Sequence, residues 1–257
     1  MIAKIKFAGK EVQVDLNKPI DLSLASKSNV SFKAWFSNEI SFKTVSNSGF
    51  TGSVSQGGAV NFREITINPH ANMTHSESVG HISSKPVPVN NIINQLNVVA
   101  QLISISPQNI LNDNGVHKKG DSCVLLKQLE NKIYKNVKGL IIRTQKNYES
   151  LENKNHSNTN WPYLSEESAL YIRKMGIKHL LIDQPSIDRE YDCGMLLAHK
   201  AFWNFPKTID KERTITELIG VPNNVKDGIY LLSLTIANIE NDASPSRPVI
   251  YEMKFSK

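Results

Sequence analysis

Three of the chain's seven histidines and one glutamate fall within residues 68–81. Imidazole nitrogen and carboxylate oxygen are the ligands that a divalent cation such as zinc takes in proteins. His75 and Glu77 are two residues apart, so in an extended segment both side chains leave the same face and can reach one ion. His81 follows after a bend expected at Gly80, where it can contact a water beside the ion rather than the ion itself. The alternative is a set of ordinary surface histidines before a turn.

His70 lies out of phase with the other candidate ligands of this stretch. In a regular strand it would point to the face opposite that of His75. Pro69 cannot donate to a strand ladder, and Asn72 tolerates unusual dihedral angles. We therefore predict a bulge or turn at residues 71–73 that brings His70 to the ion.

A second group of polar residues follows the apolar run at residues 179–182. Asp183 and Asp188 come after this predicted strand, at the carboxyl end where open α/β sheets place functional groups. His199 lies in a helix predicted for residues 195–203. A lone histidine on a helix is more often a surface or hydrogen-bonded core residue than a ligand, so the pattern alone leaves His199 undecided.

These residues form patterns that resemble one known family. The signature H-x-G-T-H-x-D-x-P-x-H belongs to the metal-dependent cyclase/hydrolase family, which includes bacterial kynurenine formamidase and isatin hydrolase. The string that resembles it here is Thr74-His75-x-Glu77-x-x-x-His81. The second conserved block of the family is similar to Asp183-x-Pro185-Ser186-x-Asp188 followed by Leu197-Ala198-His199. A third block, which closes the pocket in the family, is similar to Asn241-Asp242-Ala243-Ser244-Pro245.

The chain departs from the signature mainly at its front edge. Met73 stands where the motif has glycine, Glu77 where it has aspartate and Val79 where it has proline. The leading histidine of the motif falls on Ala71, with His70 one position earlier.

The resemblance implies a swivelling β/β/α fold, which agrees with the mixed α+β pattern of strands and helices in the sequence. No linker divides the chain convincingly, so we expect a single domain over residues 1–257. The resemblance also implies a homo-oligomer, either a dimer or a tetramer. In the family the helical histidine supplies a ligand and a later glutamate completes the site. Glu217 is the best candidate for that glutamate, because the alternative, Glu212, lies in a charged run typical of a solvated loop. The expected metal ligands are therefore His70, His75, Glu77, His199 and Glu217.

The function that this resemblance implies is hydrolysis of a small amide, formamide or cyclic amide, as in kynurenine formamidase. One or two divalent ions, zinc or manganese, would polarise the scissile carbonyl and lower the pKa of a bound water. His81 would act as general base and acid and give a proton to the leaving nitrogen. The rival interpretation is a family member that has lost turnover and serves as a binding or scaffold protein. Its support is the altered motif front, Ala71, Asn72 and Met73.

The elements that must position these residues alternate between strand and helix in the middle of the chain. Residues 96–105, 139–143 and 179–183 have the pattern of buried strands. A helix capped by Ser165 and ended by Gly176 lies before the last of them. This order predicts a parallel α/β layer. A further helix is predicted from residue 121 or 122 to residue 135, and a hairpin over residues 2–16.

Composition sets the broad class of protein. The chain has 257 residues, 40% hydrophobic and 21% charged, which is ordinary for a globular protein. The net charge of +6 comes from scattered lysines, and no stretch interleaves aromatics with Arg and Lys, so we expect no nucleic-acid partner. Cys123 and Cys193 form no C-x-x-C motif, and no run reaches the apolar length of a membrane span. We expect a cytoplasmic protein with a small-molecule substrate and no membrane partner.

Overall fold

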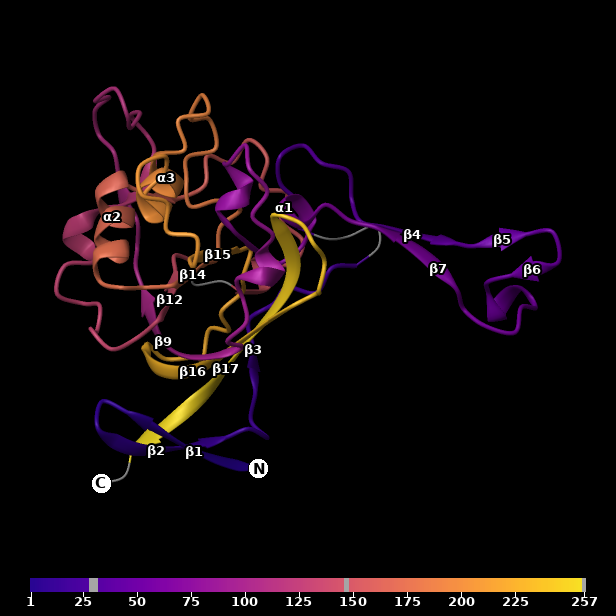
Figure 1. The fold of residues 1–257 in the computed structure, drawn as a ribbon. Helices are drawn as coiled ribbons and strands as arrows, with labels where there is room; N and C mark the ends of the chain where they lie inside the picture. Colours follow the sequence, from indigo (N-terminus) through magenta and orange to yellow (C-terminus); the bar gives the residue numbers. More distant parts are fainter. Residues whose placement is uncertain (28–31, 146–147, 256–257) are drawn as a thin grey trace.

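A computed structural model describes residues 1–27, 32–145 and 148–255 of the chain. Within this described part, seven strands close into a ring (Figure 1). Four of them pair in parallel, in the order β9 (Asn97–Ser104), β12 (Gly139–Arg143), β14 (His179–Ile182) and β15 (Thr214–Glu217). The other three pair antiparallel and close the ring: β8 (His75–Glu77), β17 (Ala243–Phe255) and β16 (Gly228–Ile236).

The central parallel strands β12 and β14 are buried on both faces, as their nearly continuous apolar sequences require. Side chains of a strand alternate between its faces. Ile141 and Leu181 therefore join one hydrophobic cluster with Leu232 and Ile250 of the antiparallel strands. Their neighbours along β12 and β14 join a second cluster, which the helices cover: Leu140, Ile142, Leu180 and Ile182. The predicted parallel layer is confirmed.

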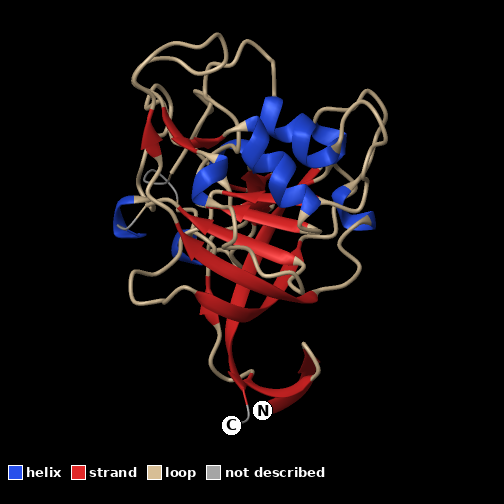
Figure 2. Ribbon diagram, turned by 90° about the vertical axis from the view of Figure 1, so that its left-hand side faces the viewer, coloured by secondary structure: helices blue, strands red, loops and turns tan. Residues whose placement is uncertain are grey.

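Two helices cover this outer face of the parallel strands (Figure 2). α2 (Glu166–Lys174) starts at Ser165, whose hydroxyl accepts a hydrogen bond from Ser168 N, and ends before Gly176, where φ is +81°. α3 (Leu197–Trp203) packs beside α2 and presents Ala198 and Phe202 to the same cluster. Both helices lie where the sequence predicts them, although α3 begins two residues later. Among the described residues, no helix is long and apolar enough to cross a membrane.

The remaining strands lie outside the ring. The predicted N-terminal hairpin is present as β1 (Ile2–Phe7) and β2 (Lys10–Asp15), and β2 pairs with the end of β17. β3 (Ile20–Asp21) pairs with the middle of β17. A small sheet contains β10 (Gln108–Asn109), β11 (Ser122–Val124) and β13 (Tyr163–Leu164). A slender arm projects from the body (Figure 1) and contains β4 (Ser41–Thr44), β5 (Ser46–Asn47), β6 (Phe50–Thr51) and β7 (Arg63–Thr66). The one-turn helix α1 (Pro69–Asn72) and five short 3-10 turns complete the described elements. The turns are η1 (Val54–Gln56), η2 (Val79–His81), η3 (Val89–Asn91), η4 (Leu126–Gln128) and η5 (Tyr148–Ser150).

The helix predicted from residue 121 or 122 to residue 135 is wrong. The segment forms β11 and the single turn η4, and Asn131 has a left-handed φ of +61° that no α-helix continues through. The carboxylate of Asp121 caps no helix, because it accepts hydrogen bonds from the Tyr163 hydroxyl and the Arg189 guanidinium. Leu129 and Ile133, which gave the segment its helical spacing, reach the core from successive turns instead.

Candidate metal centre

The short strand β8 forms the floor of the candidate site because it lies between β15 and β17. Its register sets His75 opposite Glu217 of β15 and Glu77 opposite Ala243 of β17. His75 and Glu77 therefore share one face, as the two-residue spacing predicts. Ser76 points the other way and its hydroxyl lies 2.7 Å from that of Thr216.

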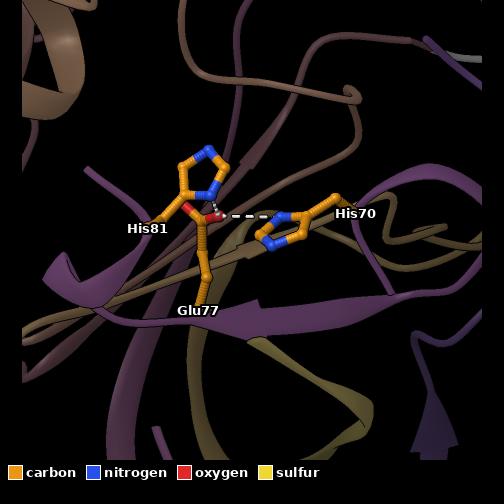
Figure 3. Close-up of side chains that lie close together, drawn as sticks. All are labelled: His70, Glu77 and His81. Carbon is orange, nitrogen blue, oxygen red and sulfur yellow. Dashed lines mark ion pairs between the residues drawn. The ribbon is translucent and has the colours of Figure 1, made fainter. Parts of the chain in front are cut away.

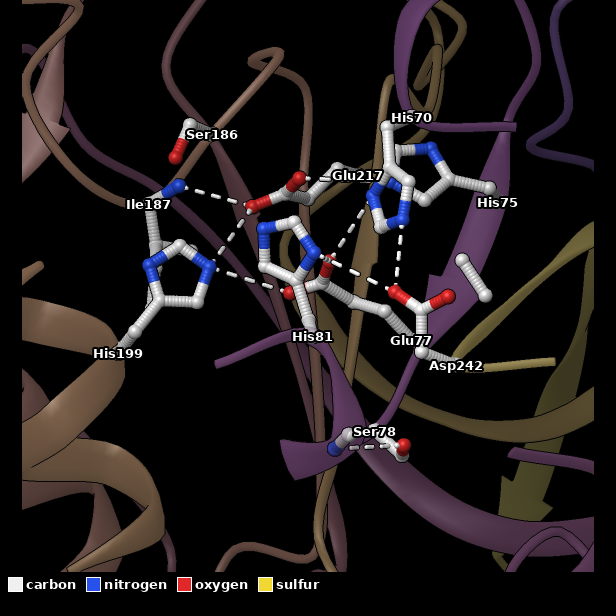
Figure 4. Close-up of polar contacts among 12 residues, drawn as sticks. His70, His75, Glu77, Ser78, His81, Ser186, Ile187, His199, Glu217 and Asp242 are labelled. Atoms are coloured by element: carbon white, nitrogen blue, oxygen red, sulfur yellow. Dashed lines mark hydrogen bonds and ion pairs between the residues drawn. The ribbon is translucent and has the colours of Figure 1, made fainter. Parts of the chain in front are cut away.

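The inner half of the centre contains two histidines and two glutamates (Figure 4). His75 Nε2 lies 3.5 Å from Glu217 Oε2, and His199 Nε2 lies 3.1 Å from Glu77 Oε1 and 3.8 Å from Glu217 Oε1. The four residues are 0–3% exposed. One ligand atom from each of His75, Glu77 and Glu217 can lie within 4.8 Å of the others, which is close enough to hold one cation.

Two buried atoms of this inner half, His75 Nε2 and Glu77 Oε2, form no hydrogen bond of good geometry among the described residues, although His75 Nε2 lies 3.5 Å from Glu217 Oε2 and His70 Nδ1 lies 3.2 Å from Glu77 Oε2. Leaving a buried polar atom unpaired costs about 1–3 kcal/mol, and more for a charged group. A divalent cation between these atoms would satisfy both, because imidazole nitrogen and carboxylate oxygen are its usual ligands. The donor set therefore fits a divalent metal ion.

The outer half of the centre contains His70 and His81, which approach the other side of Glu77 (Figure 3). His70 Nδ1 lies 3.2 Å and His81 Nδ1 3.9 Å from Glu77 Oε2, and the three residues form a second group that could hold a cation. Glu77 thus belongs to both groups. The His70 and His81 side chains are 23% and 33% exposed, so this half is open to solvent and the inner half is not.

His70 reaches the centre because the backbone turns just before β8. Residues Pro69–Asn72 form the one-turn helix α1, with Pro69 at its first position, and Met73 returns to an extended conformation. The turn that we predict at residues 71–73 is therefore confirmed, and it begins two residues earlier. Met73, which stands where the family has glycine, directs its sulfur to the Ser26 hydroxyl rather than into the centre.

His199, His75 and His70 each turn one ring nitrogen toward a glutamate and are held at the other ring nitrogen. Asp188 Oδ2 lies 2.5 Å from His199 Nδ1, the Met73 carbonyl lies 3.0 Å from His75 Nδ1, and Asp242 Oδ2 lies 3.0 Å from His70 Nε2. Acceptors of this kind fix the tautomer and orientation of metal-binding histidines. The arrangement turns one ring nitrogen of each histidine toward Glu77 or Glu217.

Asp188 also holds the start of α3. Its carboxylate accepts hydrogen bonds from the backbone N–H groups of Ala198 (2.8 Å) and His199 (3.1 Å). The residue before the helix, Leu196, supplies no side-chain cap and has a φ of +48°. The sequence singles out Asp188 by its place after the strand at residues 179–182 and by its motif block, but it does not reveal this role. Its position at the carboxyl end of β14 is the available signal.

The charges in the centre favour ionised groups. Burial raises the pKa of Glu77, but His81, His199 and His70 outweigh it and hold that pKa well below its usual range. Burial lowers the pKa of His199, but hydrogen bonds with Asp188 and Glu77 raise this pKa by more than burial lowers it. The net shift of the pKa is therefore upward. For His70 the same balance, with Asp242 and Glu77 as partners, raises the pKa to about 10. A cluster that attracts protons this strongly also attracts a cation that replaces them.

The choice between the two candidate glutamates follows from their positions. Glu217 is the last residue of β15 and is buried beside His75, where Ile187 N donates a 2.9 Å hydrogen bond to its Oε1. The Glu212 side chain is 80% exposed and pairs with Lys178. The structure thus brings Glu217 into the centre and leaves Glu212 on the surface.

Fold and centre together define a class of protein, a closed α+β strand ring with a histidine–carboxylate centre on one short strand. The chain belongs to the Cyclase family, whose model, with the description "Putative cyclase", matches residues 14–189. His70 to Asp188 of the centre lie within this match, and His199, Glu217 and Asp242 follow it.

Solved structures show the same fold at low sequence identity. One described as a potential metal-dependent hydrolase with cyclase activity has a TM-score of 0.65 and 15% identity, and the match covers 91% of this chain and 97% of that one. Isatin hydrolase A from Labrenzia aggregata has a TM-score of 0.63 and 13% identity, covering 93% and 94%. A predicted metal-dependent hydrolase from Bacillus stearothermophilus has a TM-score of 0.60 and 17% identity, and the match covers 91% of this chain and 98% of that one. No curated protein matches the chain in sequence. The predicted cyclase-like fold is confirmed.

Proposed function

We propose that this protein is a metal-dependent hydrolase that cleaves the C–N bond of a small amide, formamide or cyclic amide. The observation that carries the proposal is the convergence of the buried side chains of His75, Glu77 and Glu217, whose ligand atoms lie close enough together to hold one cation. His199 and His70 complete the proposed ligand set from either side of Glu77. The cofactor is one or two divalent ions, zinc or manganese.

A divalent ion held there would supply Lewis-acid chemistry, polarising a carbonyl oxygen and lowering the pKa of a water. The chain supplies the proton transfers. His81 lies on the open side, with Nδ1 3.4 Å from Asp242 Oδ2. Its Nε2 is then free to take a proton from the attacking water and to give it to the leaving nitrogen. The products are a carboxylate and an amine, or the ring-opened amino acid of a cyclic amide.

The approach of His70 to Glu77 favours an enzyme over a catalytically inactive binding protein. The rival interpretation rests on the altered motif front, and the turn α1 supports the enzyme because it brings the His70 imidazole within 3.2 Å of Glu77 in spite of Ala71. The similarity in fold to isatin hydrolase supports a cyclic amide as a first substrate to try. The resemblance of the motif to that of kynurenine formamidase supports an arylformamide as a second.

The test is a hydrolysis screen on protein loaded with Zn²⁺ or Mn²⁺. The screen measures release of carboxylate or amine from isatin, small lactams and N-formyl arylamines, including N-formylkynurenine. We expect turnover of at least one class, lost on metal removal and restored by re-addition. Glu212→Ala serves as the control variant, because this carboxylate lies outside the centre. A protein that binds the metal and hydrolyses none of these compounds would favour the binding-protein interpretation.

We further propose that the protein acts as a homo-oligomer, a dimer or a tetramer. The projecting arm supports this, because Phe62 and Ile65 are 57% and 59% exposed on it. Light scattering coupled to size-exclusion chromatography measures the mass directly, and a monomer at micromolar concentration would contradict this proposal.

A further inference from the structure

Asp242 contacts the outer half of the centre without being one of the proposed metal ligands. Its Oδ2 lies 3.0 Å from His70 Nε2 and 3.4 Å from His81 Nδ1, so one oxygen atom contacts both histidines of the outer half (Figure 4). These histidines come from different turns, α1 and η2. A shared acceptor therefore fixes their relative position.

The backbone around Asp242 is held firmly enough for this task. Asp242 is the residue before β17, and its carbonyl accepts a 2.9 Å hydrogen bond from Ser78 N, next to Glu77. The preceding residue, Asn241, accepts one from Val89 N, also at 2.9 Å. Ring closure between β8 and β17 thus places this carboxylate over Glu77 from a distant part of the sequence.

Gly80 permits the close approach of Asp242. A Cβ atom at Gly80 would lie 3.2 Å from Asp242 Cβ and 2.7 Å from the Val87 carbonyl oxygen. A contact of 2.7 Å with backbone would force a shift of the chain. The absence of a side chain at Gly80 is therefore part of how Asp242 reaches the histidines.

We propose that Asp242 is a positioning residue, which holds His70 and His81 so that both face Glu77 in the outer half of the centre. The role has a particular reason in this chain. Ala71 occupies the place of the leading motif histidine, and His70 stands on a one-turn helix with a partly exposed side chain. Without a fixed acceptor at Nε2, the His70 ring is free to turn its nitrogens away from Glu77. This inference rests on the proposed function, because it assumes a metal ion in the centre.

The test compares metal binding by Asp242→Ala, Asp242→Asn and the control Glu212→Ala. Zn²⁺ affinity is measured by competition with a chromophoric chelator, and the visible spectrum of Co²⁺-loaded protein reports ligand geometry independently of activity. Loss of a group that orients a ligand typically weakens metal binding by about 10–100-fold. We expect a loss in that range and an altered Co²⁺ spectrum for Asp242→Ala, a smaller loss for Asp242→Asn, which keeps an acceptor oxygen, and no change for Glu212→Ala.

The failures of the two proposals are distinguishable. Wild-type protein that binds neither Zn²⁺ nor Co²⁺ would overturn the proposed function and this inference with it. Wild-type binding together with unchanged affinity and spectrum in Asp242→Ala would overturn only the role of Asp242. If Asp242→Ala does not fold, Asp242→Asn and Gly80→Ala decide, because a Cβ at Gly80 crowds Asp242 Cβ at 3.2 Å and leaves the carboxylate in the chain. Wild-type affinity and spectrum in both would overturn the inference.

Discussion

At the scale of single residues, the centre depends on which ring nitrogen each histidine turns toward the glutamates. A neutral imidazole has one N–H and one lone pair. Asp188 and the Met73 carbonyl can only accept, so when the histidines lose a proton to bind metal, these acceptors keep the N–H of His199 and His75 and leave the lone pairs on the nitrogens that face Glu77 and Glu217. Lone pairs are what a cation requires.

His75→Ala should abolish bound divalent metal and leave a folded protein. The substitution removes the packing of the imidazole, one hydrogen bond to Met73 O and the 3.5 Å contact of Nε2 with Glu217 Oε2, and the fold does not depend on these alone. Metal content by atomic emission and folding by circular dichroism provide the two measurements. A full equivalent of metal in this variant would end the assignment of His75 as a ligand.

His81→Gln should lower the rate of hydrolysis and leave metal content nearly intact. General acid–base groups contribute about 10²–10⁴-fold, and the loss should lie in that range. The measurement is kcat on the best substrate of the screen, with metal content determined on the same sample. Because His81 Nδ1 also lies 3.9 Å from Glu77 Oε2, an equal loss of metal would reassign His81 as a ligand.

At the scale of elements, α3 and β14 are joined through Asp188. The carboxylate that orients His199 also accepts two backbone N–H groups at the start of α3. Any shift of the helix relative to the end of β14 therefore moves the His199 ring relative to Glu77. One carboxylate, that of Asp188, therefore both orients a proposed metal ligand and caps the helix.

Asp188→Asn should weaken Zn²⁺ binding by about 10–100-fold and destabilise the protein by about 1 kcal/mol. The matched control is Ser165→Ala, which removes the cap of α2 and is expected to cost a similar amount of stability with unchanged metal affinity. Urea unfolding and chelator competition separate the two effects. Equal Zn²⁺ affinity in both variants would show that Asp188 acts on the helix alone.

The sequence predicts those elements whose residues interact with near neighbours. The strands at residues 96–105 and 139–143, and the helix after Ser165, follow from apolar runs and local caps, and they are present. The helix predicted through residue 135 failed because its apolar spacing is satisfied by turns, and Asn131 adopts a left-handed φ that no local rule demands.

For the centre, sequence spacing was enough to bring together His75 and Glu77, and the resemblance added His199 and Glu217. Neither the spacing nor the resemblance could reveal the contacts of Asp188 and Asp242 with the histidines, because these contacts depend on ring closure between residues far apart in the sequence. Asp242 and His70 are 172 positions apart. No pattern within a short window relates two such residues.

At the scale of the whole molecule, buried neutral histidines make stability depend on pH. Burial lowers the pKa of His156 to about 3, with Lys154 adding to it, and that of His179 to about 4, with Lys178 adding to it. The unfolded chain binds protons at these residues below about pH 6.5, whereas the folded protein does not until much lower pH. Stability from these groups is therefore present above pH 6.5 and falls as pH decreases toward 4.

His156→Leu should reduce the loss of stability between pH 7 and pH 5 by about 2 kcal/mol, because that is the linkage expected for one such group. The comparison with wild type is needed because Asp183, whose pKa burial raises to about 6, acts in the opposite direction over the same range. Urea unfolding of both proteins at the two pH values gives the difference. An identical pH dependence would mean that His156 is protonated in the folded protein.

The strand β8 has a consequence for the cohesion of the chain. It pairs over only three residues with each neighbour, yet it carries His75 and Glu77, while Glu217 and His199 come from much later in the sequence. A bound ion would act as a reversible cross-link, joining residues that are 122 positions apart in the case of Glu77 and His199. A link of that span restricts the unfolded chain more than a short one does, and the stability it adds grows with the logarithm of free metal concentration. Chelated protein should therefore exchange the amide hydrogens of residues 75–77 faster than metal-loaded protein, and unaltered exchange there would show that strand pairing alone keeps the ring closed.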